Sequence, residues 1–108
     1  QEVLMCIADM AIWTYTAESV VLRTQKLISM KGKEACTNQI AMAQVYVYDV
    51  ADKINKAAKD ALTAFAEGDE LRVQLMGVKR FTKTNPLNTK ALRQQVAQKL
   101  IEENKYCF

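Results

Sequence analysis

The residues best suited to bind a ligand are a group of bases around an aromatic side chain. Lys79, Arg80 and Lys83 flank Phe81 within one short stretch. Such a pattern is typical of contacts to anionic lipid headgroups or to nucleotide phosphates. The simpler alternative is that Phe81 is buried and that the bases only keep the surface hydrated. The sequence favours this alternative, because the surrounding helical segment has no large apolar face left for a membrane. The three bases are nevertheless kept as a candidate surface for contact with anions.

The carboxylates do not have the arrangement that acid–base catalysis needs, in which one carboxyl group is set apart in a cleft. Asp49 and Asp52 lie about one helical turn apart, but Lys53 and Lys56 follow them by four positions each. We therefore expect exposed ion pairs along a helix. Three further acidic residues, Glu67, Asp69 and Glu70, surround Gly68. They do not have the spacing of a calcium-binding loop, so we expect them to cap a helix.

The chain contains no histidine. This excludes a Ser-His or Cys-His nucleophile pair, a Glu-x-x-His di-metal site and most zinc sites. The two glycine-rich motifs that bind phosphate groups, Gly-x-Gly-x-x-Gly and Gly-x-x-x-x-Gly-Lys-Ser/Thr, are both absent. We predict that this segment has no catalytic, cofactor-binding or metal-binding residue.

Composition indicates one soluble helical domain that spans residues 1–108. The net charge of +3, from 15 bases and 12 acids, is too small for a nucleic-acid-binding domain. Cys6, Cys36 and Cys107 form no Cys-x-x-Cys pair, which favours free thiols in a reducing, cytoplasmic compartment. The longest uncharged run, 35–48, is too short to span a membrane. Because the chain starts at Gln1 and is apolar almost at once, we expect it to be a C-terminal fragment of a longer protein.

Glycine and proline divide the chain into four helical segments. Their predicted bounds are 2–30, 33–66, 70–82 and 88–104. Gly32 should end the first segment, because its position after a helix requires a positive φ. Asp69 and Asn88 are the predicted N-caps of the third and fourth segments.

Each segment has an apolar face with steps of three and four residues. On the first segment these residues are Val3, Ile7, Met10, Trp13, Ala17, Val20, Thr24 and Leu27. On the second they are Cys36, Ile40, Ala43, Val47, Val50, Ile54, Ala57, Ala61 and Phe65. On the third they are Leu71, Leu75, Val78 and either Phe81 or Thr82, and on the fourth Leu92, Val96 and Leu100, with Ile101 as a further candidate. The predicted fold is all-α, an up-down antiparallel four-helix bundle with two long and two shorter helices.

Several short motifs resemble helices of acyl-CoA dehydrogenases. The run Ile7-Ala8-Asp9-Met10-Ala11-Ile12-Trp13-Thr14-Tyr15, followed by Glu18-Ser19, is similar to a family helix with the pattern Leu/Ile-Ala-Asp-small-Ala and a later Tyr. In the very-long-chain-type branch, an extra helical domain follows the catalytic one. Glu70-Leu71-Arg72-Val73 and Asn85-Pro86-Leu87 resemble motifs of that domain, and the ending Tyr106-Cys107-Phe108 looks like that of longer bacterial members.

The resemblance implies that the parent protein is an FAD-dependent acyl-CoA dehydrogenase of fatty acid β-oxidation, with a Glu that abstracts the α-proton while a hydride passes to the flavin. In the family that Glu lies in a Tyr-Glu-Gly-Thr-like motif, and a Gly-Gly-x-Gly-Tyr-like motif lies near the flavin. This chain has neither motif, so Glu18, Glu34, Glu67 and Glu70 inherit no catalytic role.

The resemblance also implies partners. These are the catalytic domains of the same chain, further copies in a homo-oligomer, an electron-transfer flavoprotein and, in some members, a membrane surface; nucleic acid is not among them. We therefore expect a non-catalytic C-terminal domain that supports assembly and helps to place the enzyme on its substrate or peripherally on a membrane. Two alternatives stay open: part of the family's catalytic C-terminal bundle, or an unrelated helical protein-interaction domain.

Overall fold

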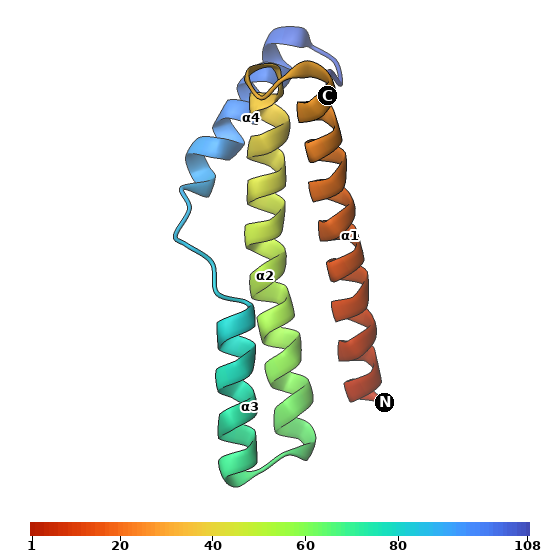
Figure 1. Cartoon of the computed structure of the whole chain (residues 1–108), viewed down its shortest axis with the longest axis vertical. Coiled ribbons are helices and arrows are strands. Elements are labelled where there is room, and N and C mark those ends of the chain that lie inside the picture. Colours follow the sequence, from red (N-terminus) through yellow and green to blue (C-terminus); the bar gives the residue numbers. More distant parts are fainter. The chain divides into compact units, whose positions relative to one another are not determined.

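The chain folds into helices without any strand (Figure 1). The computed structural model describes residues 1–108 and contains α1 (Glu2–Lys31), the 3-10 helix η1 (Glu34–Cys36), α2 (Thr37–Phe65), α3 (Gly68–Phe81) and α4 (Thr89–Glu103). The predicted all-α fold with two long and two shorter helices is confirmed. The second long helix begins later than predicted, because residues 34–36 form the 3-10 helix.

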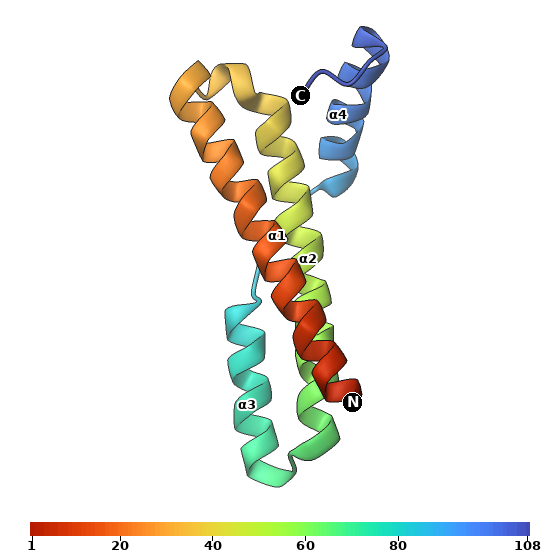
Figure 2. The ribbon, with the colours of Figure 1, turned by 90° about the vertical axis from the view of Figure 1, so that its right-hand side faces the viewer.

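The helices group into two compact units. Unit 1 contains residues 1–16 and 49–85, and unit 2 contains residues 17–48 and 86–108. In unit 1, α3 folds back along the second half of α2 (Figures 1 and 2). In unit 2, the first half of α2 folds back along the second half of α1. Each long helix therefore contributes one half to either unit.

Two predicted helix ends are confirmed. Gly32 follows α1 with a φ of 86°, and its N–H donates to the carbonyl oxygen of Ile28 at 2.8 Å. A residue without Cβ adopts this left-handed conformation at little cost, so the chain can reverse between the long helices. Asn88 caps α4, since its Oδ1 accepts a hydrogen bond from the N–H of Ala91 at 3.1 Å.

The predicted N-cap of α3 is wrong. Asp69 lies inside the first turn, and Glu67 occupies the N-cap position with an extended backbone (φ −140°, ψ 162°) and no side-chain capping bond. A carboxylate oxygen of Asp69 instead lies 3.1 Å from the guanidinium group of Arg72. Asp69 still stabilises the helix, because a negative charge in the first turn complements the helix dipole.

The buried core consists of small side chains on α2 and directly beside its ends. They are Cys36, Ala41, Ala43, Val50, Ala57, Ala61 and Ala66. Neither α1, α3 nor α4 has a fully buried residue. Because alanine side chains are short, neighbouring helices can lie close to α2, and the large apolar residues pack at the edges of these contacts.

The predicted inward faces need corrections on three helices. On α4, Leu100 is 37% exposed and Ile101 is 71% exposed, so neither is buried. On α1, Ile7 is 50% exposed, and the half-buried Cys6 lies in its place on the packed face. At the end of α2, Phe65 is 65% exposed, and Ala66 is buried instead. The prediction for α1 fails at Ile7 because that helix is apolar on two sides, so a step of three and a step of four both meet an apolar residue.

Candidate functional site

Thr82 fixes the end of α3 in unit 1. Its hydroxyl group donates to the carbonyl oxygen of Val78 at 2.8 Å and accepts a hydrogen bond from Nδ2 of Asn55 on α2 at 2.7 Å. Of the two residues that could have faced inward here, Thr82 is therefore the one that does. Successive helical residues point about 100° apart, so Phe81 is directed away from this contact.

Phe81 is not buried, which contradicts the simpler of the two alternatives drawn from the sequence. The residue is 90% exposed, and Lys79, Arg80 and Lys83 are exposed beside it. These three bases, the basic cluster, lie in the last turn of α3 and just after it. The acids of α3 lie in its first turn, at the opposite end of the helix. An exposed ring thus lies among bases that no neighbouring acid of the same helix neutralises.

A hollow between α2 and α3 adjoins the basic cluster. It has a volume of about 620 Å³, and its wall includes Lys59, Arg72 and Lys79 against a single acid, Asp52. Arg72 already pairs with Asp69. The excess of bases makes this side of unit 1 electropositive, which favours anionic partners.

The first half of α1 has a second apolar side, opposite the one that packs in unit 1. The exposed fractions of its large residues lie between 50% and 73%: Leu4, Met5, Ile7, Ile12 and Tyr15. Ala8 and Ala11 lie between them. We call this side the outer face of α1. A helix that is apolar all round is normally covered on all sides, so the outer face has the character of an interface.

The ion pairs on α2 differ from the prediction. Lys56 Nζ lies 2.7 Å from Oδ1 of Asp60, which follows it by one turn, whereas the predicted partner Asp52 precedes it by one turn. Lys53 Nζ lies 6.0 Å from the ring centre of Trp13, a cation–π geometry that holds the half-buried indole. Asp52 and Asp60 are exposed, so these groups act as surface charges.

The helices contain neither a metal-binding cluster nor a candidate membrane span. No three cysteine, aspartate or glutamate side chains come together in a way that could hold a metal ion. None of the helices combines the length and the apolar character that a membrane span requires.

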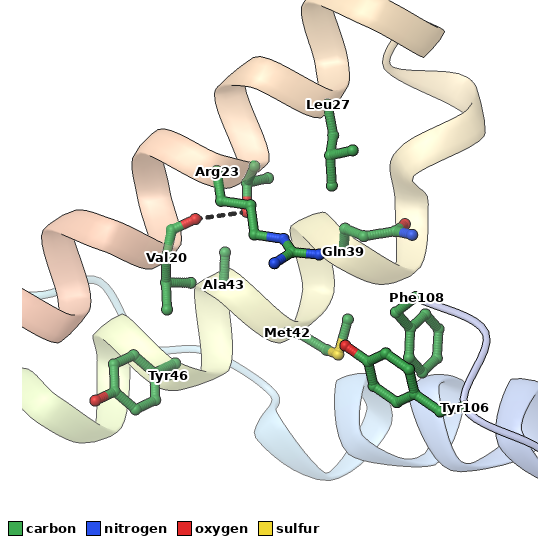
Figure 3. A pocket seen from close by; sticks show the side chains of 10 residues that line it. Val20, Arg23, Leu27, Gln39, Met42, Ala43, Tyr46, Tyr106 and Phe108 are labelled. Atoms are coloured by element: carbon green, nitrogen blue, oxygen red, sulfur yellow. Dashed lines mark hydrogen bonds between the residues drawn. The ribbon is translucent and has the colours of Figure 1, made fainter.

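A pocket of about 300 Å³ opens in unit 2 among α1, α2 and the C-terminal residues (Figure 3). Its apolar wall consists of Val20, Leu27, Met42, Ala43 and Phe108. The ring of Phe108 packs edge-on against Tyr106, with ring centres 5.9 Å apart and an angle of 86° between the planes. The sequence did not predict this pocket, because residues more than sixty positions apart form it.

Arg23 is the single charged side chain that lines the pocket. Figure 3 shows the Arg23 side chain extending from α1 toward α2, where Gln39 lies. The hydroxyl group of Thr24 already donates a hydrogen bond to the carbonyl oxygen of Val20 at 2.8 Å. The polar groups that remain for a ligand are therefore chiefly the guanidinium group of Arg23 and the amide of Gln39.

Comparisons with known proteins agree with one another. A family model described as "Acyl-CoA dehydrogenase, C-terminal domain" matches residues 1–80. A probable acyl-CoA dehydrogenase of Bacillus subtilis (strain 168) is 33% identical over 106 residues, which make up 98% of this chain and 18% of that protein. The crystal structure of an acyl-CoA dehydrogenase complexed with FAD from Bacillus anthracis matches all of this chain with a TM-score of 0.96 and 33% identity, and 19% of that chain is covered. The present chain thus spans about a fifth of the length of these relatives.

Proposed function

Because the chain belongs to the family of acyl-CoA dehydrogenase C-terminal domains, we propose that it is the non-catalytic C-terminal helical domain of an FAD-dependent acyl-CoA dehydrogenase. The relatives it matches extend over about five times its length. The catalytic residues belong to that remaining part of the parent protein, and so does the flavin, which accepts the hydride from the acyl chain. This segment supports assembly of the parent enzyme.

The residues of this segment do not fit a flavin dinucleotide. The pocket of unit 2 has about 300 Å³, which corresponds to roughly ten non-hydrogen atoms at the volume per atom of liquid water. A dinucleotide is several times larger. The hollow of unit 1 is lined by charged side chains of both signs and lacks a glycine-rich phosphate loop.

The observation that carries the assembly role is the outer face of α1. Exposure of such an apolar surface to water is unfavourable in free energy, and a partner that covers the surface removes this penalty. The partner is the catalytic part of the same chain, because a covalently linked surface is present at high effective concentration. The same face would serve an unrelated helical interaction domain, but family membership favours the intramolecular partner.

Further parts of the proposal concern the parent enzyme as a whole. It belongs to the very-long-chain-type branch, forms a homo-oligomer and passes its electrons to an electron-transfer flavoprotein. The resemblance of the motifs in α1, α3 and the loop before α4 supports this branch. The cytoplasmic location stays a prediction.

The basic cluster supports a peripheral contact with an anionic membrane surface. Lys79, Arg80 and Lys83 would lie at the headgroups, and the exposed ring of Phe81 would enter the interface beside them. Such a contact would hold the parent enzyme near apolar substrates without any membrane-spanning segment.

The test of the assembly role uses the parent protein with Leu4 and Ile12 both replaced by Lys. An apolar partner surface cannot cover these charges, so the segment should detach. Limited proteolysis should then release a fragment that contains it. The matched control is Ile101→Lys on α4, a residue that is 71% exposed. Equal release from both variants would contradict the proposed docking of the outer face.

A second measurement addresses the cofactor. The purified 108-residue chain should show no flavin absorbance, whereas the parent protein should. A flavin spectrum in the short chain would refute the assignment of the cofactor to the rest of the parent protein.

A further inference from the structure

The pocket of unit 2 combines an apolar interior with one unpaired cation at its edge. The side chains of Arg23 and Gln39 make no hydrogen bond or ion pair within the chain, and no acidic side chain lines the pocket. Arg23 is itself exposed, so its guanidinium group lies where the pocket meets solvent. A cation beside a cavity without a counter-ion favours a ligand that supplies the negative charge.

The interior selects the remainder of such a ligand. The side chains of Val20, Leu27, Met42 and Phe108 contain only carbon and sulfur atoms. Methionine adapts its shape to flexible chains. The volume of about 300 Å³ lies at the small end of ligand pockets and accommodates about ten non-hydrogen atoms.

We infer that this pocket binds an amphipathic monocarboxylate with a chain of about eight carbon atoms. The carboxylate accepts hydrogen bonds from the guanidinium group of Arg23 and from the amide of Gln39. The alkyl chain lies between α1 and α2 under the ring of Phe108. A carboxylate suits the site better than a phosphate monoester, because one guanidinium group neutralises a single negative charge and leaves the second charge of a phosphate unpaired.

This inference is independent of the docking role proposed above. The pocket lies in unit 2, whereas the outer face of α1 and the basic cluster lie in unit 1. Either proposal can therefore fail without the other.

The test measures binding of octanoate to the 108-residue chain by equilibrium dialysis and locates it by amide chemical-shift changes in NMR. We expect one octanoate per chain and shift changes around Arg23, Gln39 and Phe108. Octanol, which lacks the carboxylate, and acetate and inorganic phosphate, which lack the chain, should bind more weakly. Arg23→Gln should weaken octanoate binding about tenfold, the effect of losing a charge-assisted hydrogen bond.

The controls separate the pocket from general charge. Lys26→Gln removes the same charge from an exposed position of the same helix outside the pocket and should leave binding unchanged. Val20→Phe fills the cavity and should reduce binding while the far-UV circular dichroism stays helical. If the short chain is not helical, the same dialysis is done on the parent protein, where the wild type should bind one more octanoate per chain than Arg23→Gln at a concentration that saturates the pocket.

Three results would overturn the inference. Arg23→Gln could bind octanoate as tightly as the wild type, octanol could bind as well as octanoate, or the shift changes could map to unit 1. Any one of them would show that the unpaired guanidinium group and the apolar cavity do not act together.

Discussion

Contact of the basic cluster with an anionic membrane can be tested by removing its two components separately. Each Lys or Arg near an anionic surface contributes about 1 kcal/mol, so Lys79, Arg80 and Lys83 together contribute about 3 kcal/mol. Phe81 is 90% exposed, and partial burial of its ring adds about 1–2 kcal/mol. The total of about 4–5 kcal/mol corresponds to half-maximal binding between about 0.2 and 1 mM accessible lipid.

The assay is flotation with vesicles that contain phosphatidylserine, compared with vesicles of phosphatidylcholine alone. Phe81→Ala should weaken binding about 5- to 30-fold, and the triple change of the basic cluster to Gln about 150-fold. A matched triple variant replaces Lys26, Lys31 and Lys33 with Gln. These residues are exposed and carry the same total charge, but they surround the turn at Gly32. This control variant should bind nearly as well as the wild type.

Two results would refute the reasoning about the basic cluster. If the two triple variants lost binding equally, net charge and not the position of the bases would control it. If phosphatidylcholine vesicles bound as well as anionic ones, the charges would contribute nothing. Raising the salt concentration to about 1 M, where the screening length falls to about 3 Å, should abolish most of the binding of the wild type and leave the smaller contribution of Phe81.

Three further predictions concern stability. Gly32→Ala should lower the free energy of unfolding by about 1 kcal/mol in a urea titration, because the φ of 86° strains a residue with Cβ although no atom lies within 4 Å of the added methyl group. Asn88→Ala should cost about 1 kcal/mol in the same titration, since the N–H of the first turn of α4 loses its acceptor. The hydrogen bond to Glu103 and the negative charge of its carboxylate raise the pKa of Lys99 above its ordinary 10.5. The stability from this pair is therefore present below pH 10.5 and is lost as the pH rises through the higher value in the folded chain, and NMR titration should show a lower pKa of Lys99 in Glu103→Gln.

The number and order of the α-helices were predictable because glycine, proline and capping residues mark where the helices end and begin. Gly32 and Asn88 act through local backbone geometry, which needs no knowledge of the rest of the fold. Asp69 was a good N-cap residue by type, yet the cap falls on Glu67. In a run of polar residues, the turn that leads into the helix decides which one takes the extended backbone, and that turn depends on how α2 ends.

The candidate site was predictable only in part. The basic cluster follows from residue types, but the exposure of Phe81 depends on the hydrogen bond between Thr82 and Asn55, which are 27 positions apart. The same limit applies to the pocket, because Phe108 lies far in sequence from Arg23. A signal for the outer face was present, however: Leu4, Met5 and Ile12 fall outside the predicted inward face and are as apolar as the residues on it.

The distribution of side-chain sizes links the fold to the proposed role. This chain buries alanine, cysteine and a single valine, while Leu4, Ile12, Phe65 and Ile101 are each more than half exposed. A methyl group that is buried stabilises far less than a buried Leu or Ile, because the free energy gained scales with the apolar area removed from water. The segment therefore gains little from its own core and has much more to gain from covering its large apolar residues. A second surface that packs on α1 would stabilise the helices and the complex together, which is the energetic reason for such a segment to form part of a larger enzyme.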